Sequence, residues 1–336
     1  MDTSMKFLTF LTLLIGYFVY ITYQAYLMDI AIASLMAISF GKLTYFFSTK
    51  IKNRYILSFF ITFLFLSLIL LPILYFLIVV ANYIAHIDIA QVKLVVFKIK
   101  TILVYLPDIV REKIEFYLNS DNIQVIYNKL VPIIASLTTK SAFFIKDLFL
   151  IIIFFFFAVL YSKEILTFLK DVIPLDNKKL ETLFFNTSEV MSVVFYSTIL
   201  TAILEGVLFG ALVYFFGFDF IFFTIMYAFA SLIPVIGGII MWGPISGYLY
   251  AIGKPYEAIS LIIYSIVVIS IIADTFIKPI IIKYVQDVFK AKTNLNSLLI
   301  FFSIVAGLSS FGIWGIIIGP AVTALFISIL NFYKEV

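Results

Sequence analysis

Three charged residues lie within long apolar stretches of this chain, where charged side chains are rare and costly. Glu205 stands in TAILEGVLFG, and Asp274 and Lys278 stand four residues apart in DTFIKP, on one face of a helix. A carboxylate in hydrocarbon is costly, so it is expected to face a partner or a water-filled cavity. Glu205 is therefore a candidate carrier of a proton or cation, the alternative being a structural hydrogen bond. Asp274 and Lys278 are a candidate gate or substrate-site pair, the alternative being an ion pair at the end of a span.

Two other apolar stretches, 219–252 and 296–331, exceed the roughly 20 residues of one bilayer crossing and are interrupted by glycine and proline. Backbone groups freed at such paired breaks point to a transporter's binding site. The alternatives are a loop between two spans and close helix packing through small residues. The candidate hairpin tips along the substrate path are Pro234, Gly237, Gly238, Gly307, Gly312 and Gly315, and the candidate hinges are Pro244, Pro279 and Pro320.

The composition identifies the broad class. Of the 336 residues, 64% are hydrophobic and 12% are charged, whereas a soluble domain carries about 25% charged residues. We therefore expect a multi-pass membrane protein. The chain has no cysteine, its single histidine is His86, and it lacks a phosphate-binding Gly-x-x-x-x-Gly-Lys-Ser/Thr loop. We expect no enzyme activity, no metal site and no cofactor, and the modest net charge of +4 does not suggest nucleic acid.

The distribution of apolar residues predicts an all-α membrane protein with about eight transmembrane segments, two of them broken. Six full spans are expected at about 7–23, 27–47, 56–82, 142–161, 191–216 and 257–277. Helical spacing of apolar residues within 83–141 predicts a small extracytoplasmic helical cap. The expected regions are a three-span region at 1–82, the amphipathic helical region at 83–141, the fourth span with a cytoplasmic helix hairpin at 142–190, and a transport core at 191–336.

Positive charge orients these spans. The basic residues that follow the second and fourth spans should be cytoplasmic, which leaves 83–141 on the other side. If each broken stretch crosses the bilayer once, the basic segment 278–295 falls outside. If each is instead a re-entrant hairpin, that segment falls inside and the two halves form an inverted repeat. We favour the hairpins, because one assumption then explains the basic segment and both breaks.

The C-terminal half carries an ordered set of motifs: TAILEGVLFGALVYFFGF, LIPVIGG, WGP, DTFIKP and GLSSFGIWGIIIGP. Over about 195–331 these motifs resemble the autoinducer-2 exporter family, which comprises bacterial permeases with eight predicted spans. The resemblance implies export, with a small signalling furanone as the nominal substrate, cation/proton antiport in other members, and homo-oligomers. The chain departs from the family pattern at Thr275, where Asn is common, and at Glu205, where Gln is expected.

Together these observations predict a permease of the bacterial cytoplasmic (inner) membrane that exports a small solute by alternating access of the broken hairpins. One alternative is a monovalent cation/proton antiporter, for which Glu205 is the discriminating residue. Another is a passive channel or a non-transporting scaffold. The expected partners are a small-molecule or ion substrate, the lipid bilayer and further copies of the chain. We expect these copies to form a ring, pentamer-like in size, with the first spans and the cap at the contacts.

Overall fold

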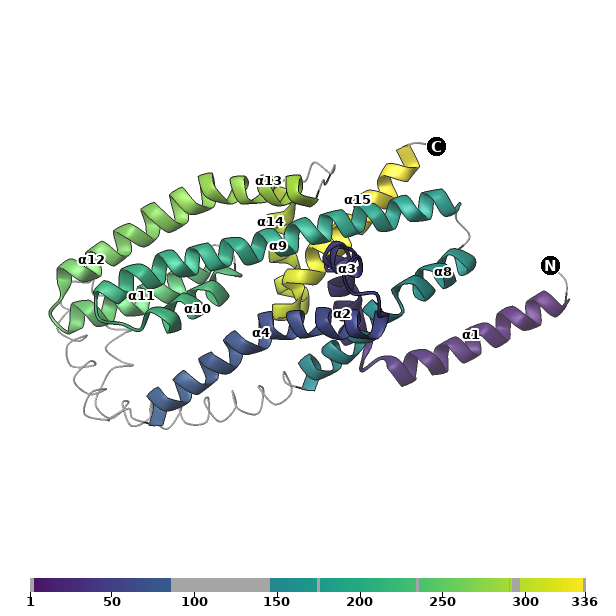
Figure 1. Cartoon of the computed structure of the whole chain (residues 1–336), viewed down its shortest axis with the longest axis horizontal. Coiled ribbons are helices and arrows are strands. Elements are labelled where there is room, and N and C mark those ends of the chain that lie inside the picture. The colour runs from purple at the N-terminus through teal and green to yellow at the C-terminus, as the bar shows by residue number, and fades with distance from the viewer. Residues whose placement is uncertain are drawn as a thin grey trace, which may run out of the picture.

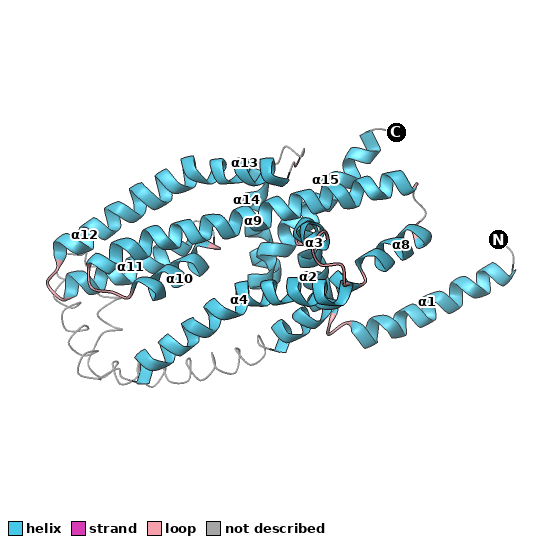
Figure 2. Ribbon diagram, viewed as in Figure 1, coloured by secondary structure: helices cyan, strands magenta, loops and turns pink. Residues whose placement is uncertain are grey.

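The computed structural model describes residues 3–85, 146–173, 176–233, 236–289, 291 and 297–334. Every regular element within these ranges is a helix, as Figures 1 and 2 show. The all-α prediction is therefore confirmed for the described part of the chain. The predicted cap at 83–141 lies outside the described residues, apart from 83–85 at the end of a long helix. The cap stays a prediction.

The N-terminal half contains helices for each expected span, but two of these helices are bent. The second expected span consists of two helices that meet at 52° around Phe40. The helix of the fourth, expected at 142–161, ends at Leu160, and α8 follows it after a bend of 76°. The third helix continues through Pro72. The elements are α1 (Thr3–Tyr23), α2 (Leu27–Ser39), α3 (Gly41–Ser48), α4 (Arg54–Ala85), an unlabelled helix at Lys146–Leu160 and α8 (Ser162–Val172).

The C-terminal half is built around one helix of 39 residues, α9. Helix α9 begins within the segment 163–190, shortly after α8, and continues into the expected fifth span without a break. The cytoplasmic helix hairpin expected there stays a prediction. The elements are α9 (Asn177–Phe215), α10 (Phe220–Ser231), α11 (Ile236–Ala251), α12 (Pro255–Tyr264), the π-helix η1 (Ser265–Ile277), α13 (Lys278–Phe289), α14 (Ser297–Phe311), the 3₁₀ turn η2 (Gly312–Trp314) and α15 (Gly315–Lys334).

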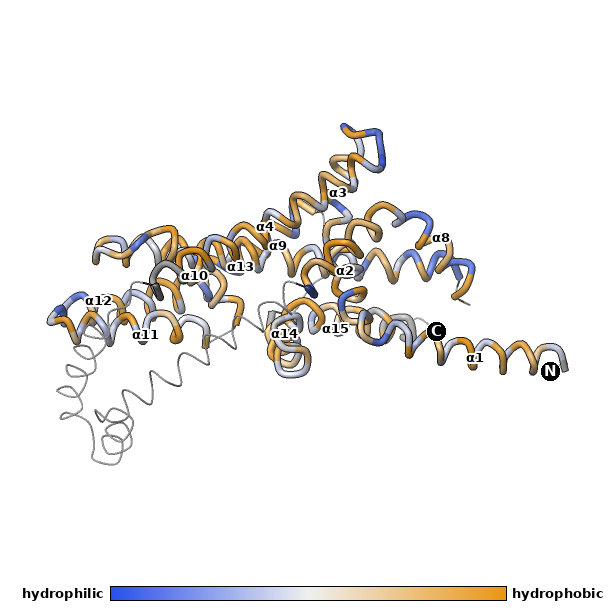
Figure 3. The backbone as a smooth tube through the Cα atoms, turned by 90° about the horizontal axis from the view of Figure 1, so that it is seen from below, coloured by the Kyte–Doolittle hydropathy of each residue, from blue (hydrophilic) through white to orange (hydrophobic). Residues whose placement is uncertain are grey.

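By length and composition, four described helices could cross a bilayer, or six if each bent pair is one span. These six correspond to the six expected full spans. The two broken stretches consist of shorter apolar helices, α10 with α11 and α14 with α15. Figure 3 shows hydrophobic residues along the helices and hydrophilic residues gathered at the turn beyond α3 and along α8. The total of eight segments stays a prediction.

Each broken stretch folds back on itself as a pair of closely packed antiparallel helices. In the first, a Cβ placed on Gly237 would lie 1.8 Å from the carbonyl oxygen of Ala230. In the second, a Cβ on Gly307 would lie 2.1 Å from the carbonyl oxygen of Gly315. Gly312 turns the chain between α14 and α15 with a φ of +61°, which an L-residue rarely adopts. Whether either hairpin enters and leaves a membrane on one side stays a prediction.

The helix that runs from Pro255 to Phe289 continues through Pro279, where the sequence suggested an end or a bend. A proline lacks the N–H of an α-helical bond and clashes with the carbonyl four residues back. The π-helix η1 ends at Ile277, two residues before Pro279, and the N–H of Lys278 donates to the carbonyl of Ala273, five residues back. This wider register moves the obstructing carbonyl away, so that the helix can continue as α13.

Two apolar clusters hold the helices together. One surrounds Phe40, whose ring lies 5.6 Å from that of Phe65 and 5.5 Å from that of Phe155. The other surrounds Phe209 and Tyr227, whose rings stack at 4.4 Å. The first cluster packs the bend between α2 and α3, and the second packs α9 against the first hairpin. The Phe40 cluster also contains Ile318 of α15, so it joins the two halves, whereas the second cluster lies within the C-terminal half.

Candidate coupling site

Glu205 is buried in α9, with 6% of its surface exposed. The glycine that follows it explains how α10 approaches so closely. A Cβ on Gly206 would lie 2.4 Å from the carbonyl oxygen of Thr224, and one on Gly210 would lie 2.9 Å from that of Phe220. Small residues four apart let two helix backbones come together in this way. They bring the end of α10, with Ser231, against the carboxyl group of Glu205.

Glu205 lies in one cluster with the two other charged residues that the sequence singled out. Its carboxyl group interacts with the side chains of Asp274 and Ser231 and, electrostatically, with Lys278. Asp274 and Lys278 form a salt bridge of 3.1 Å and are about half-exposed. The structure therefore brings together, from α9 and from η1 and α13, residues that are far apart in the sequence.

The chemistry of this cluster follows from its composition. Two carboxyl groups can share a hydrogen bond only when one of them carries a proton. With Lys278 charged, the three side chains have a net charge of −1 when both carboxyl groups are ionised and of zero after one protonation. A proton or a monovalent cation would balance that charge. Tyr227, buried in α10, interacts electrostatically with both carboxylates and closes one side.

The π-helix sets which side chains face α9. The long helix Pro255–Phe289 runs antiparallel to α9, as Figure 1 shows, and it is tied to α9 where the hydroxyl of Tyr264 donates to the carbonyl of Leu208 at 3.2 Å. A π segment changes the rotation per residue, so the residues beyond it point in new directions. Asp274 lies within this segment and Lys278 directly after it, which places both toward Glu205.

The candidate tip of the first hairpin lies beside this cluster. Ser231 is the last residue of α10, and Gly237 and Gly238 are in the first turn of α11. A Cβ on Gly238 would lie 2.9 Å from the hydroxyl oxygen of Tyr227. Pro234 lies outside the described residues. The described residues on both sides of the first break thus lie next to the charged cluster.

The second hairpin makes its described contacts elsewhere. Trp314 and Ile318 pack in the Phe40 cluster, and Ala324 packs on Val190 and Val194 in the first half of α9. Gly307 and Gly315 pack against each other within the hairpin. Pro244 and Pro320 lie inside α11 and α15, which continue through them. A substrate path along this hairpin, and hinge roles for the prolines, stay predictions.

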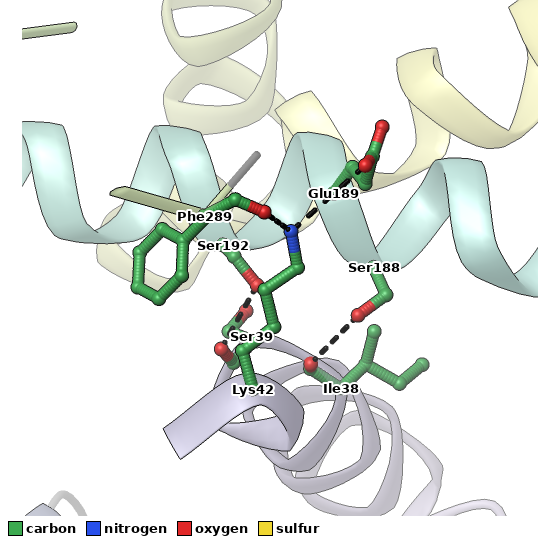
Figure 4. Close-up of polar contacts among 7 residues, drawn as sticks. All are labelled: Ile38, Ser39, Lys42, Ser188, Glu189, Ser192 and Phe289. Atoms are coloured by element: carbon green, nitrogen blue, oxygen red, sulfur yellow. Dashed lines mark hydrogen bonds and ion pairs between the residues drawn. The ribbon is translucent and has the colours of Figure 1, made fainter. Parts of the chain in front are cut away.

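A second polar junction was missed by the sequence analysis. Figure 4 shows Lys42 of α3 reaching between α9 and the end of α13. Its ammonium nitrogen lies 3.9 Å from a carboxylate oxygen of Glu189 and donates to the carbonyl of Phe289. Ser188 and Ser192 of α9 donate to the carbonyls of Ile38 and Ser39, at 3.2 and 3.0 Å. One signal could have found it, because Lys42 is a charge inside an expected span.

Within the described ranges, no group of three or more His, Cys, Asp or Glu side chains is placed to hold a metal ion.

Comparison with known proteins identifies the family. The model of the AI-2E family transporter matches residues 7–335. The chain belongs to the AI-2E transporter family. A protein of Helicobacter pylori (strain ATCC 700392 / 26695) named "Putative transport protein" is 33% identical over 96% of this chain and 94% of its own length. A protein of Aquifex aeolicus with the same name is 24% identical over 89% of each chain. This AI-2E family member is thus a multi-pass membrane transport protein, and the resemblance seen in the C-terminal motifs extends over nearly the whole chain.

Proposed function

We propose that this AI-2E family transporter exports a small solute across the bacterial cytoplasmic membrane by alternating access, and that Glu205, Asp274 and Lys278 couple transport to a proton. The observation that carries the proposal is the pairing of the buried Glu205 carboxyl with Asp274. A buried carboxyl group beside a second carboxyl group is expensive to keep for structure alone. It is useful where a proton must be taken up on one side and released on the other.

The position of the pair supports a role in transport. Glu205 lies on α9, Ser231 lies at the tip of a broken hairpin, and Asp274 lies in a π segment. Broken hairpins and π segments both recur at functional sites, because they free backbone groups and can change register. A proton that neutralises the pair removes a net charge between these three elements. Loss of that charge favours a different packing of the hairpin against α9, which is the movement that alternating access requires.

The substrate that we propose is supported only by the description of the family model, AI-2E family transporter. A small, polar signalling furanone is therefore the first solute to test. We also propose a ring-like homo-oligomer. Helix α1 supports this, since none of its candidate span is buried against the rest of the chain. Other copies, together with lipid, could cover it.

A second candidate is monovalent cation/proton antiport. The net charge of −1 on the deprotonated cluster favours it, because Na⁺ or K⁺ can replace a proton without changing the overall charge balance. Asp274 and Lys278 are about half-exposed, which leaves the cluster open to such an ion. In this case the coupling site would itself be the transport site.

One experiment separates these functions. The purified protein is placed in liposomes that contain a pH-sensitive dye. Uptake of the furanone signal is then followed with and without an imposed pH gradient. Solute uptake that depends on the gradient, with dye quenching, supports the coupled exporter. Dye response to a pulse of NaCl or KCl, without the solute, supports the antiporter. Flow only down the solute gradient supports a passive channel, and the absence of any flux supports a scaffold.

A further inference from the structure

Lys42 of α3 forms an ion pair with Glu189 of α9. Glu189 lies on the same helix as Glu205 but far from it. Glu189 precedes Glu205 by 16 residues of α9, or about 24 Å at 1.5 Å per residue. The Glu189 side chain is 2% exposed and that of Lys42 is 24% exposed. Removing two charges from water is expensive, and at 3.9 Å the attraction is far from optimal. Such a pair adds little net stability to the fold, but loss of one partner leaves the other charge buried and uncompensated, so the contact favours the arrangement that keeps it.

The same lysine joins three segments that are distant in sequence. From α3 it reaches Glu189 on α9 and the carbonyl of Phe289, the last residue of α13. The last carbonyls of a helix have no partner within the helix, and a cation is favoured there. Figure 4 shows the ammonium group between these two partners. The Lys42 side chain thus links α3, the end of α13 and α9.

Helix α3 packs on the N-terminal core through the partly buried side chains of Leu43 and Phe47, and the Phe47 ring lies 4.9 Å from that of Phe60. It has eight residues, and none of them is fully buried. The bend that precedes it is, in contrast, firmly held. The Phe40 ring packs in the N-terminal core, and the serine hydroxyls of α9 hold the carbonyls of Ile38 and Ser39. A helix without a fully buried residue can move about a well-packed bend at a lower cost in free energy than a helix of the core.

The charge pattern assigns a side to this end of the molecule. The turn after α3 carries Lys50, Lys52 and Arg54, and α9 begins with Lys178 and Lys179. Arg54 pairs with Glu164 at the start of α8, at 2.7 Å, so these basic segments lie together. The positive-inside rule makes this the cytoplasmic end.

We propose that Lys42, Glu189 and the Phe289 carbonyl form the cytoplasmic gate of the transporter, closed in this structure. The gate opens when α3 swings about Phe40 and Lys42 leaves both partners. The contact region between α9 and the helix formed by η1 and α13 then becomes accessible from the cytoplasm. This region extends from the gate to Glu205 and Asp274. An exporter must load its solute from this side. The inference rests on the alternating-access function proposed above, and it adds the residues that control loading.

The opening can be measured without any transport assay, because the chain has no cysteine. Ser192 is fully buried behind the gate. The rate at which Ser192→Cys reacts with a water-soluble maleimide, in vesicles with the cytoplasmic face outward, reports how often the gate opens. We expect Lys42→Met to raise this rate about tenfold or more, because a contact to a charged group contributes at least that factor to the closed state. Lys42→Arg can still reach both partners and should restore a rate near that of the parent.

A control distinguishes opening from general loosening. Ser246 is also buried, but it lies in α11, away from the gate. Alkylation of Ser246→Cys should be the same with Lys42 and with Lys42→Met. An equal rise of the alkylation rate at both positions in Lys42→Met would contradict the gate proposal. So would equal rates at Ser192→Cys with Lys42 and with Lys42→Met.

A cross-link gives the converse test. A Cβ on Gly41 would lie 3.9 Å from the hydroxyl oxygen of Ser188, so Gly41→Cys with Ser188→Cys can form a disulfide beside the gate. Oxidation should abolish flux in liposomes, and reduction should restore it. Undiminished flux in the oxidised protein would refute the gate. The proposed coupling function fails by a different result, namely unchanged pH dependence in Glu205→Gln, and the alkylation rates do not depend on it.

Discussion

Gly307 and Gly315 pack backbone against backbone: a Cβ on Gly307 would lie 2.1 Å from the carbonyl oxygen of Gly315, and a Cβ on Gly315 would lie 1.9 Å from that of Gly307. No side chain lies between them that could move aside. The hairpin α14–α15 therefore depends on both glycines.

The first prediction is that Gly307→Ala or Gly315→Ala destabilises the detergent-solubilised protein by about 1–3 kcal/mol, the usual cost of overpacking. Gly243→Ala is the matched control, because nothing lies within 4 Å of its Cβ and it is inside α11. That change should be neutral or stabilising by up to about 1 kcal/mol, since alanine favours helix. Thermal unfolding followed by tryptophan fluorescence measures all three, and equal midpoints would contradict the packing described.

The second prediction concerns coupling. Glu205→Gln keeps the shape of the side chain and introduces the residue expected at this position in the family. It should leave the protein folded and retain downhill solute exchange, but flux driven by a pH gradient should fall to the level without the gradient. Asp274→Asn should impair both modes, because it removes the ion-pair partner of Lys278. Equal pH-driven flux in the wild type and Glu205→Gln would end the proton-carrier proposal.

The third prediction is that Gly206→Ala disrupts the coupling site through packing. Its new methyl group would lie 2.4 Å from the backbone of Thr224, so α10 must move away and carry Ser231 with it. We expect a loss of about 1–3 kcal/mol of stability and an altered pH dependence of flux. Gly247→Ala has open space around it and should change neither. If Gly206→Ala transports with a normal pH profile, the position of α10 does not matter for coupling.

The fourth prediction concerns topology. If α10 and α11 form a re-entrant hairpin, the turn before α12 lies outside, and Lys254→Cys reacts with an impermeant maleimide added to intact cells. If 219–252 crosses the membrane once, this turn lies inside and is protected. Lys178→Cys, at the start of α9, should be protected in both cases and serves as the control. Labelling of Lys178→Cys together with protection of Lys254→Cys would show that the chain has the opposite orientation in the membrane.

Much of the fold could be predicted because apolar runs and glycine breaks are local signals. The sequence predicted that the chain turns back before α11 and at Gly312, because glycine and proline disfavour a continuous helix there. The bend at Phe40 did not, because it depends on aromatic packing from α4 and on hydroxyl groups from α9. Only the neighbouring Gly41 marked it in the sequence.

The charged site was predicted residue by residue but not as a cluster. Asp274 and Lys278 were paired by helical spacing, which is local. Their contact with Glu205 requires a long helix to run antiparallel to α9, and a π segment to turn them toward it. Such register changes arise from packing and leave no periodic pattern. Glu189 was missed because it lies in a segment expected to be solvated, where a carboxylate needs no explanation.

The length of α9 has a mechanical consequence. Its 39 residues extend over about 58 Å, nearly twice the thickness of the hydrocarbon core. A rigid rod of this length is a lever: if it pivots at Glu205, a tilt of about 5° moves Asn177, 28 residues away, by about 4 Å. Movements around Glu205 that are too small to follow directly would therefore be amplified at the Asn177 end of the helix. A spectroscopic distance probe there would report them.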